Sequence, residues 1–335
     1  MAVSRRRFLR VTAACAGGSY LGSAAPLFAA SPERGATDRL RSRVALTRNA
    51  KAVDGPTVHR PVLREMLFDT LGTVTGASTI EDAWRMLLRP NEVVGIKFNR
   101  SGQRLLGTSA TLAEELVRSM MSAGVPPGRI VCIEAPPGID RELRTRPLRS
   151  GFAHTVSDFG SGEDQLAIVL SQITALINVP FLKTHNIAGF TCGLKNLSHG
   201  LVKHPARFHD QGCSPFIADI AALPEIRSKL RLTLVDALRV VFDGGPEPTA
   251  ETIADSGTLI ASVDPVAADA IGLYSLNNIR LGRKLERAQP SPGYADYLAR
   301  ASRRGLGRSS LERIEVVESV NGVSAPKGGN GGSGA

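Results

Sequence analysis

Residues 93–135, VVGIKFNRSGQRLLGTSATLAEELVRSMMSAGVPPGRIVCIEA, indicate the fold class of this chain. The stretch opens with a short β-rich run at 93–98 and closes with another at 129–135. Between them, residues 111–123 space their apolar side chains as one face of a helix does, and Gly124 marks the end of that helix. A strand, a helix and a strand in this order predict two parallel strands joined by a right-handed crossover.

The rest of the chain continues this alternation. Further helices are predicted at 62–71, 80–88 and 294–303 and after Ser214 and Asp264, and further strands at 166–170, 175–179, 230–235, 257–262 and 314–317. The prediction is a single α/β domain over residues 57–320, with a mostly parallel or mixed central sheet flanked by helices. We expect a polar, basic linker at 30–56 and a disordered Gly-rich tail at 321–335.

The composition excludes several classes of protein. Aromatic residues make up only 5% of the 335 residues, which argues against a stacking platform for single-stranded nucleic acid. No run of about 18 uninterrupted apolar residues occurs, so a protein with several membrane spans is excluded. Four cysteines are too few for a disulfide-dense scaffold.

The first residues are typical of an export signal. Ser-Arg-Arg-Arg-Phe-Leu-Arg at 4–10, followed by an Ala- and Gly-rich apolar stretch, resembles a bacterial twin-arginine signal peptide. Cleavage after Ala29 would remove four arginines and no acid, which lowers the net charge from +10 to +6. We therefore expect a periplasmic or other extracytoplasmic protein without a stable transmembrane span, with the export machinery as a partner and nucleic acid excluded. This route resembles one for proteins that are already folded, many of them carrying a cofactor.

Three cysteines remain after cleavage: Cys132, Cys192 and Cys213. A four-cysteine iron–sulfur cluster is therefore excluded within this chain. One disulfide is allowed, between Cys192 and Cys213, and it would leave an odd thiol.

Histidines are concentrated in one segment. Four of the six in the chain lie within 25 residues: His185, His199, His204 and His209. If residues 191–203 are helical, Cys192, Lys195, Asn196, His199 and Lys203 form one polar stripe. Imidazoles suit a transition metal or proton transfer, and lysines at a helix start suit an anion. The competing interpretation is a solvated helix face.

Other polar residues follow predicted strands, where ligands gather in open α/β sheets. Lys183 and His185 lie just after the apolar run that ends at Val179, and Asp236 follows the strand at 230–235. Asp264 is either a site residue or the N-cap of the helix that Pro265 begins.

These positions give a candidate site. The catalytic candidates are His185, Lys183 and Lys195; the ligand-binding candidates are Asn99, Thr184, Asn196, Gly244 and Gly245; and the metal candidates are His185, His199, Asp236 and Asp264.

Six motifs carry a resemblance to a known family. They are VGIKFN at 94–99, NVPFLKTH at 178–185, GLKN at 193–196, DA at 236–237, GGP at 244–246 and DPVAAD at 264–269. Together they resemble the bacterial and archaeal domain of unknown function 362, with a core at about 90–275. The family usually has a lysine where this chain has Phe181, and some members resemble iron–sulfur proteins through a fused ferredoxin-like module. The resemblance implies a site map and no reaction.

The sequence thus predicts an exported protein with a polar cleft of His, Lys and Asp side chains. We expect an enzyme that performs hydrolysis or proton transfer on a small anionic substrate, with a divalent transition metal as the candidate cofactor. The alternative is a non-catalytic periplasmic binding or accessory protein that carries a metal, a cofactor or an anion.

Overall fold

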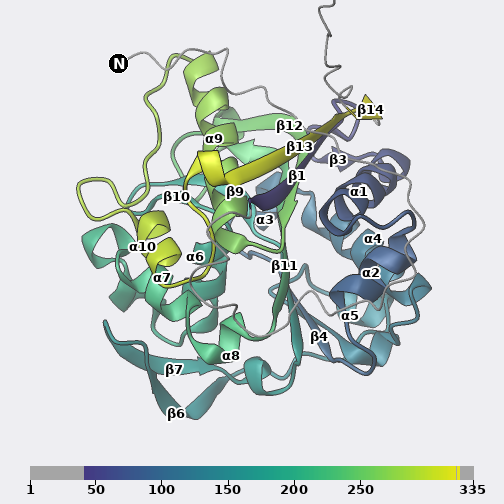
Figure 1. Ribbon diagram of the computed structural model, residues 1–335, viewed down its shortest axis with the longest axis horizontal. Helices are drawn as coiled ribbons and strands as arrows, with labels where there is room; N and C mark the ends of the chain where they lie inside the picture. Colours follow the sequence, from purple (N-terminus) through teal and green to yellow (C-terminus); the bar gives the residue numbers. More distant parts are fainter. Residues whose placement is uncertain (1–40, 322, 325–335) are drawn as a thin grey trace, which may run out of the picture.

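The computed structural model describes residues 41–321 and 323–324. The described chain is an α/β fold around a ten-stranded mixed sheet, in the order β14-β13-β1-β12-β11-β8-β4-β5, with β9 beside β11 and β10 beside β9 (Figure 1). The strands are β1 (Ser42–Arg48), β4 (Val94–Lys97), β5 (Ile130–Ile133), β8 (Ala175–Asn178), β9 (Phe181–His185), β10 (Gly189–Thr191), β11 (Leu230–Val241), β12 (Ile253–Ser262), β13 (Ile314–Val320) and β14 (Val323–Ser324). The predicted fold class is confirmed.

Helices cover both faces of the sheet (Figure 1). They are α1 (Arg60–Thr75), α2 (Ile80–Leu87), α3 (Gln103–Leu106), α4 (Ser109–Ser122), α5 (Ile139–Glu142), α6 (Gly193–Ser198), α7 (Phe216–Ala221), α8 (Pro224–Arg227), α9 (Pro265–Gly282) and α10 (Tyr297–Arg303). In β12, Leu259 and Ala261 pack into the apolar core that contains Leu63 of α1, whereas Ile260 packs into the core that contains Ile271 of α9. Successive side chains of a strand point to opposite faces, so the sheet separates two cores.

Two small hairpins complete the description of the strands. They pair β2 (Val53–Asp54) with β3 (Thr57–Val58), and β6 (Phe152–Asp158) with β7 (Glu163–Ala167). The strand predicted at 166–170 is displaced, because β7 ends at Ala167 and a 3-10 turn, Ile168–Ser171, follows it.

The strand–helix–strand unit predicted from residues 93–135 is present. β4 and β5 are parallel neighbours, in register from Val94 opposite Ile130 to Lys97 opposite Ile133. The connecting helix α4 buries Leu112 and Leu116 against the sheet. The apolar periodicity was therefore sufficient to predict this half of the sheet.

The prediction of a linker at 30–56 is wrong for Ser42–Arg48, which form strand β1. β1 lies inside the sheet, antiparallel to β12 and parallel to β13, and Val44, Ala45 and Leu46 are buried. This run is short and stands among arginines, so its composition resembles a linker. Arg43 and Arg48 lie at the ends of the buried run, where Arg43 pairs with Glu315 and Arg48 donates to Thr258.

β11 is longer than predicted, and this moves Asp236 away from a strand end. The strand runs on to Val241 through an irregularity between Ala237 and Arg239. Asp236 is therefore buried within the sheet, where it accepts hydrogen bonds from Thr108 Oγ1 at 2.5 Å and Leu238 N at 3.2 Å.

The predicted signal peptide at 1–29 lies outside the described residues, as do residues 322 and 325–335 of the predicted tail. The prediction of disorder is wrong for Val323–Ser324, which form β14 antiparallel to β13. Among the residues that are described, no helix combines the length and apolar character that a membrane crossing requires.

Candidate functional site

A cleft of about 620 Å³ opens beyond the carboxyl ends of β4, β5 and β9. Asn99 follows β4, Glu134 follows β5, and Lys183 and His185 belong to the last three residues of β9. The other residues that line the cleft include Arg100, Ser101, Gln103, Arg104, Lys195, Asn196, His199, Gly200, His209, Pro246 and Glu247. The predicted location, at the carboxyl ends of parallel strands, agrees with this arrangement.

A buried lysine that was not among the predicted site residues lies beneath the lining of the cleft and holds two of its lining residues, Glu134 and Asn196. Lys97 is fully buried, and its Nζ lies 2.9 Å from Glu134 Oε2, 3.1 Å from Asn196 Oδ1 and 2.8 Å from Phe98 O. Burial lowers the pKa of Lys97, and the neighbouring Glu134 carboxylate opposes that shift. A Cβ on Gly200 would lie 2.5 Å from Lys97 Nζ, so a larger residue at 200 would displace the Lys97 ammonium.

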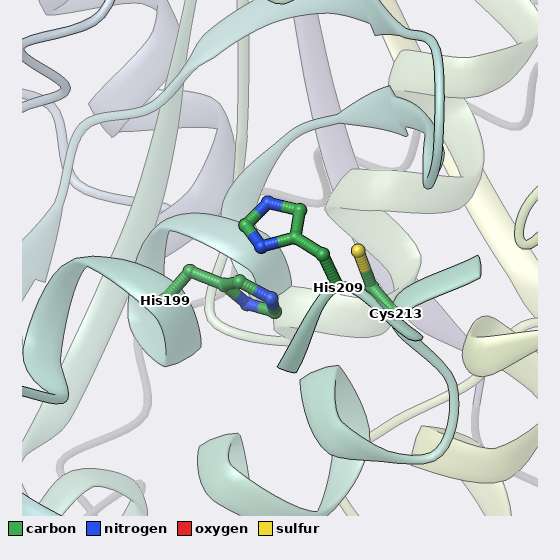
Figure 2. Close-up of side chains that lie close together, drawn as sticks. All are labelled: His199, His209 and Cys213. Atoms are coloured by element: carbon green, nitrogen blue, oxygen red, sulfur yellow. The ribbon is translucent and has the colours of Figure 1, made fainter. Parts of the chain in front are cut away.

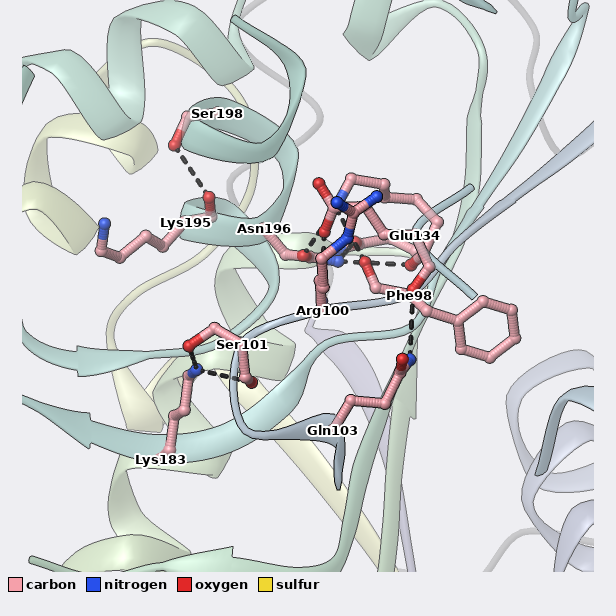
Figure 3. A network of polar contacts seen from close by, with 11 residues as sticks. Phe98, Arg100, Ser101, Gln103, Glu134, Lys183, Lys195, Asn196 and Ser198 are labelled. Carbon is pink, nitrogen blue, oxygen red and sulfur yellow. Dashed lines mark hydrogen bonds and ion pairs between the residues drawn. The ribbon is translucent and has the colours of Figure 1, made fainter. Parts of the chain in front are cut away.

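Glu134 organises the loop in front of the cleft. Its Oε2 also accepts from Arg100 N at 3.2 Å, and its carbonyl accepts from Gln103 Nε2 at 3.1 Å (Figure 3). Its φ of 52° lies in the left-handed region, which residues other than glycine rarely adopt. One signal in the sequence pointed to Lys97, which belongs to the VGIKFN motif at 94–99.

Lys183 fastens the same loop to β9. It is 1% exposed, and its Nζ lies 2.9 Å from Ser101 O, 2.6 Å from Ser101 Oγ and 3.2 Å from Pro246 O (Figure 3). Ser101 Oγ in turn donates to Glu247 Oε1 at 2.6 Å. Burial lowers the pKa of Lys183 to about 8, more than the attraction of Glu247 raises it.

Three of the four clustered histidines meet beside Lys195. The ring centroids of His185 and His209 are 5.5 Å apart, and those of His199 and His209 are 4.7 Å apart. Lys195 Nζ lies 3.3 Å from His209 Nε2, and burial lowers the pKa of Lys195 to about 8. His204 is separate, because its half-exposed side chain pairs with Asp164.

The hydrogen bonds of His185 define its tautomer. Its Nδ1 accepts from the backbone N–H groups of Ile187 and Ala188, both at 3.1 Å. Burial, followed by Lys195, His209 and Lys183, lowers its pKa to about 3. The neutral ring therefore carries its proton on Nε2 and acts as a hydrogen-bond donor, which is unlike the metal ligand that the sequence predicted.

A different group of side chains could hold a metal ion. One ligand atom each from His199, His209 and Cys213 lies within 4.8 Å of the others (Figure 2). A carbonyl oxygen can only accept, so His199 Nε2 donates to Phe208 O at 2.9 Å and His209 Nδ1 donates to Pro205 O at 3.0 Å. Metal-binding histidines usually hold their second nitrogen in this way. The other nitrogens carry the lone pairs and have polar neighbours, since His199 Nδ1 lies 3.0 Å from Ser198 Oγ and His209 Nε2 lies 3.3 Å from Lys195 Nζ.

The cysteines differ from the predicted disulfide. Cys132, Cys192 and Cys213 are all free and buried. Burial raises the pKa of Cys213 while the charge of Lys195 opposes the shift, and the backbone at Cys213 has a φ of 62°.

The two aspartates predicted as metal ligands lie elsewhere. Asp236 is the buried partner of Thr108. Asp264 is the N-cap of α9, where it accepts from Ala267 N at 2.9 Å, and it also accepts from Ser42 Oγ and Arg308 N. The capping interpretation of Asp264 is thus correct, and neither carboxylate lines the cleft.

The predicted helix at 191–203 is shorter than expected. α6 ends at Ser198 and a 3-10 turn follows, so the exposed Lys203 instead contacts Gln165. The N–H groups at the start of α6, predicted to hold an anion, are occupied by Asp269, which accepts from Gly193 at 2.6 Å and Leu194 at 3.1 Å.

The remaining ligand-binding candidates divide into two groups. Asn99 and Asn196 line the cleft, although the Asn196 amide is also bonded to Lys97 and Asn178. Thr184, Gly244 and Gly245 lie behind it: Gly245 N donates to Thr184 Oγ1, and a Cβ on Gly245 would lie 1.9 Å from Thr184 O. These three shape the turn that presents Pro246 and Glu247.

Comparisons with known proteins agree with part of the predicted resemblance. The family described as domain of unknown function 362 matches residues 161–274, about a third of the chain. No curated protein matches the chain. Among solved structures, the lactate racemase apoprotein from Thermoanaerobacterium thermosaccharolyticum is 14% identical, with a TM-score of 0.42, and the match covers 72% of this chain and 58% of that one.

Replacing Lys195 by Met should stabilise the protein at neutral pH. The folded pKa of about 8 lies below the usual value of 10.5, so the unfolded chain binds more protons between these pH values and stability rises with pH there. Below pH 8 the cost of burying the ammonium is complete, and we expect Lys195→Met to raise the free energy of unfolding at pH 7 by about 2 kcal/mol. Urea denaturation at pH 7 and pH 9.5 measures this gain.

The gain should shrink at the higher pH, where wild-type Lys195 is largely neutral. The exposed Lys203→Met variant is the control, with a change within about 0.5 kcal/mol. A gain that does not vary with pH would contradict the lowered pKa.

Proposed function

We propose that this protein is an exported enzyme that binds a small anionic substrate in the cleft and performs hydrolysis or proton transfer on it. The observation that carries the proposal is the buried ammonium of Lys195. It is 6% exposed, its hydrogen-bond partner is the neutral ring of His209, and no ion pair within residues 41–321 includes it. A buried charge without an opposite charge is costly, and an anionic substrate group would supply the missing partner.

The charges around the cleft support an anion rather than a cation. Both carboxylates that line the cleft already have a lysine nearby, since Glu134 pairs with the buried Lys97 and Glu247 lies across Ser101 from Lys183. Arg100 and Arg104 add positive charge at the exposed rim. The net charge of the residues around the cleft is therefore positive, and a positive cleft attracts small anions.

The side chains around Lys195 have complementary roles in this proposal. Lys195 binds the anionic group, and the Nε2–H of His185 donates a hydrogen bond to a substrate oxygen. Lys183, with a pKa of about 8, can give or take a proton near neutral pH. The similarity to the domain of unknown function 362 adds no reaction, because that name assigns none.

Anion binding should stabilise the wild-type protein and not the Lys195→Met variant. Thermal unfolding in increasing phosphate, acetate and succinate measures this, and an anion at a hundred times its Kd would add about 2.7 kcal/mol. Lys203→Met should respond as wild type does. Equal stabilisation of the Lys195→Met variant would place the anion elsewhere and contradict the proposal.

Turnover separates an enzyme from a binding protein. Anionic 4-nitrophenyl esters report hydrolysis, and the enzyme should lose activity in the Lys195→Met variant. Binding that depends on Lys195 without turnover of any ester or exchange of substrate protons would favour the non-catalytic alternative.

A metal-dependent enzyme is a second candidate, favoured by the group of His199, His209 and Cys213. Three protein ligands leave the fourth position of a tetrahedral metal open, as in catalytic zinc sites. A transition metal held there would act as a Lewis acid toward a substrate oxygen. The ligand atoms would have to approach one another, since donors around one tetrahedral ion lie roughly 3.5 Å apart.

Elemental analysis by mass spectrometry should find about one equivalent of a transition metal in protein purified without a metal-binding tag. His209→Ala and Cys213→Ser should lose it, because each removes one of three ligands, whereas His204→Ala should keep it. Cobalt titration provides a second measurement through the thiolate-to-cobalt absorption in the near ultraviolet. Metal-free protein that also gives no such absorption would eliminate the metal-dependent candidate.

Export by the twin-arginine route completes the proposal and is supported by residues 4–29 alone. Replacing both Arg5 and Arg6 by Lys should leave the uncleaved precursor in the cytoplasm, as measured by cell fractionation and intact mass. Arg7→Lys is the matched control and should still be exported and cleaved after Ala29. Export of the double variant at the wild-type level would refute this route.

A further inference from the structure

We propose that Ser101 is a nucleophile activated by Lys183, and that the cleft hydrolyses acyl esters that carry a second, anionic group. The anionic part of this substrate class rests on the proposed function. The nucleophile rests on the geometry at Ser101 alone. Ser101 lies on the loop between β4 and α3, lines the cleft and is partly exposed.

The bonding around Lys183 Nζ suits a base as well as an acid. Carbonyl oxygens only accept, so Ser101 O and Pro246 O each take one N–H from Nζ. A neutral amine has two N–H groups and one lone pair, and these two carbonyls use both N–H groups. The lone pair then faces Ser101 Oγ at 2.6 Å, within reach of its proton. The same positions accommodate the ammonium, whose third N–H points at Oγ.

Glu247 is the alternative acceptor for the Ser101 hydroxyl. When Lys183 is charged, its N–H occupies one lone pair of Oγ, and the hydroxyl proton is directed to Glu247 Oε1 at 2.6 Å. When Lys183 is neutral, the proton can be directed to Nζ instead. Four charged groups act on Lys183: Glu247 and Glu134 favour its charged form, whereas Lys195 and Lys97 oppose it.

His185 supplies a donor beside this pair. Residues two apart on a strand point to the same face, so Lys183 and His185 both face the cleft from β9. The proton of His185 is held on Nε2 by the backbone bonds to Nδ1. A fixed N–H of this kind can stabilise the oxyanion that forms when a hydroxyl attacks a carbonyl.

The reaction balances without any oxidant or further co-reactant except water. Ser101 Oγ bonds to the ester carbon as its proton passes to neutral Lys183, and the carbonyl electrons move to the oxygen. The oxyanion collapses, the bond to the leaving alkoxide breaks, and the alkoxide takes the proton from Lys183. Water then attacks the acyl-Ser101 ester with Lys183 again as base, which releases the acid and restores the hydroxyl.

A purely structural role for Lys183 would give a different result. In that role its three bonds fasten the loop of Ser101 and Pro246 to β9, and Ser101 would react no faster than an ordinary exposed serine. Ser122, an exposed residue at the end of α4, is the internal standard for that reactivity.

The test is labelling of the full chain with a fluorophosphonate, which forms a bond from serine oxygen to phosphorus as fluoride leaves. We expect one adduct at Ser101 by intact mass and peptide mapping, absent in Ser101→Ala and unchanged in Ser122→Ala. Lys183→Arg keeps the charge but provides no base, and it should label about a hundredfold more slowly or less. The rate should rise with pH around 8, the pKa of Lys183.

Glu247→Gln keeps the labelling test decisive if Lys183→Arg fails to fold. Loss of the Glu247 charge should shift the midpoint of the pH profile to lower pH, because that charge favours protonated Lys183. An unshifted profile, or no adduct at Ser101, overturns the nucleophile. Anion binding that depends on Lys195 would then leave the proposed function intact, whereas labelling of Ser101 without anion binding would overturn only the anionic substrate.

Discussion

The ammonium of Lys97 is the contact on which the architecture of the cleft depends. It is buried at the end of β4 and joins Glu134, the residue after β5, to Asn196 from α6. A charge without water must be paired in this way, so three elements distant in the sequence are held at fixed positions. Glu134 then holds the backbone of Arg100, which brings Ser101 to Lys183. Side chains that line the cleft are thus positioned by a group that itself lies beneath the surface.

The apolar periodicity of the sequence predicted the central helices and strands but missed one strand and the end of another. Apolar spacing located α4 and the parallel pair β4 and β5, because each of these elements buries a regular face. It missed β1, whose buried run is three to four residues long and stands among arginines. It also ended β11 six residues early and so placed Asp236 at a strand end. Polar side chains within a strand resemble a terminus when the tertiary partner, here Thr108, is unknown.

The sequence predicted which segment contributes most of the side chains at the site, but not the contacts among them. Clustering of histidines and lysines near 183–209 was correct, since most of these side chains line one cleft. Ser101, Glu134 and Glu247 were missed because they reach the cleft from other segments, and no local pattern links them to Lys183. The role of His185 was also beyond the sequence, because its tautomer depends on two backbone N–H groups that only the folded turn directs at it.

The position of β1 has a consequence for the timing of folding. Within the described residues this strand pairs with β12 and β13, and these neighbours in the sheet are more than 200 residues away along the chain. During synthesis β1 therefore remains without its sheet partners until β12 and β13 have been made. A chain released before β12 and β13 are made would lack both strands that pair with β1. β1 can therefore enter the sheet only after the chain has been made as far as β13, whose last residue is Val320.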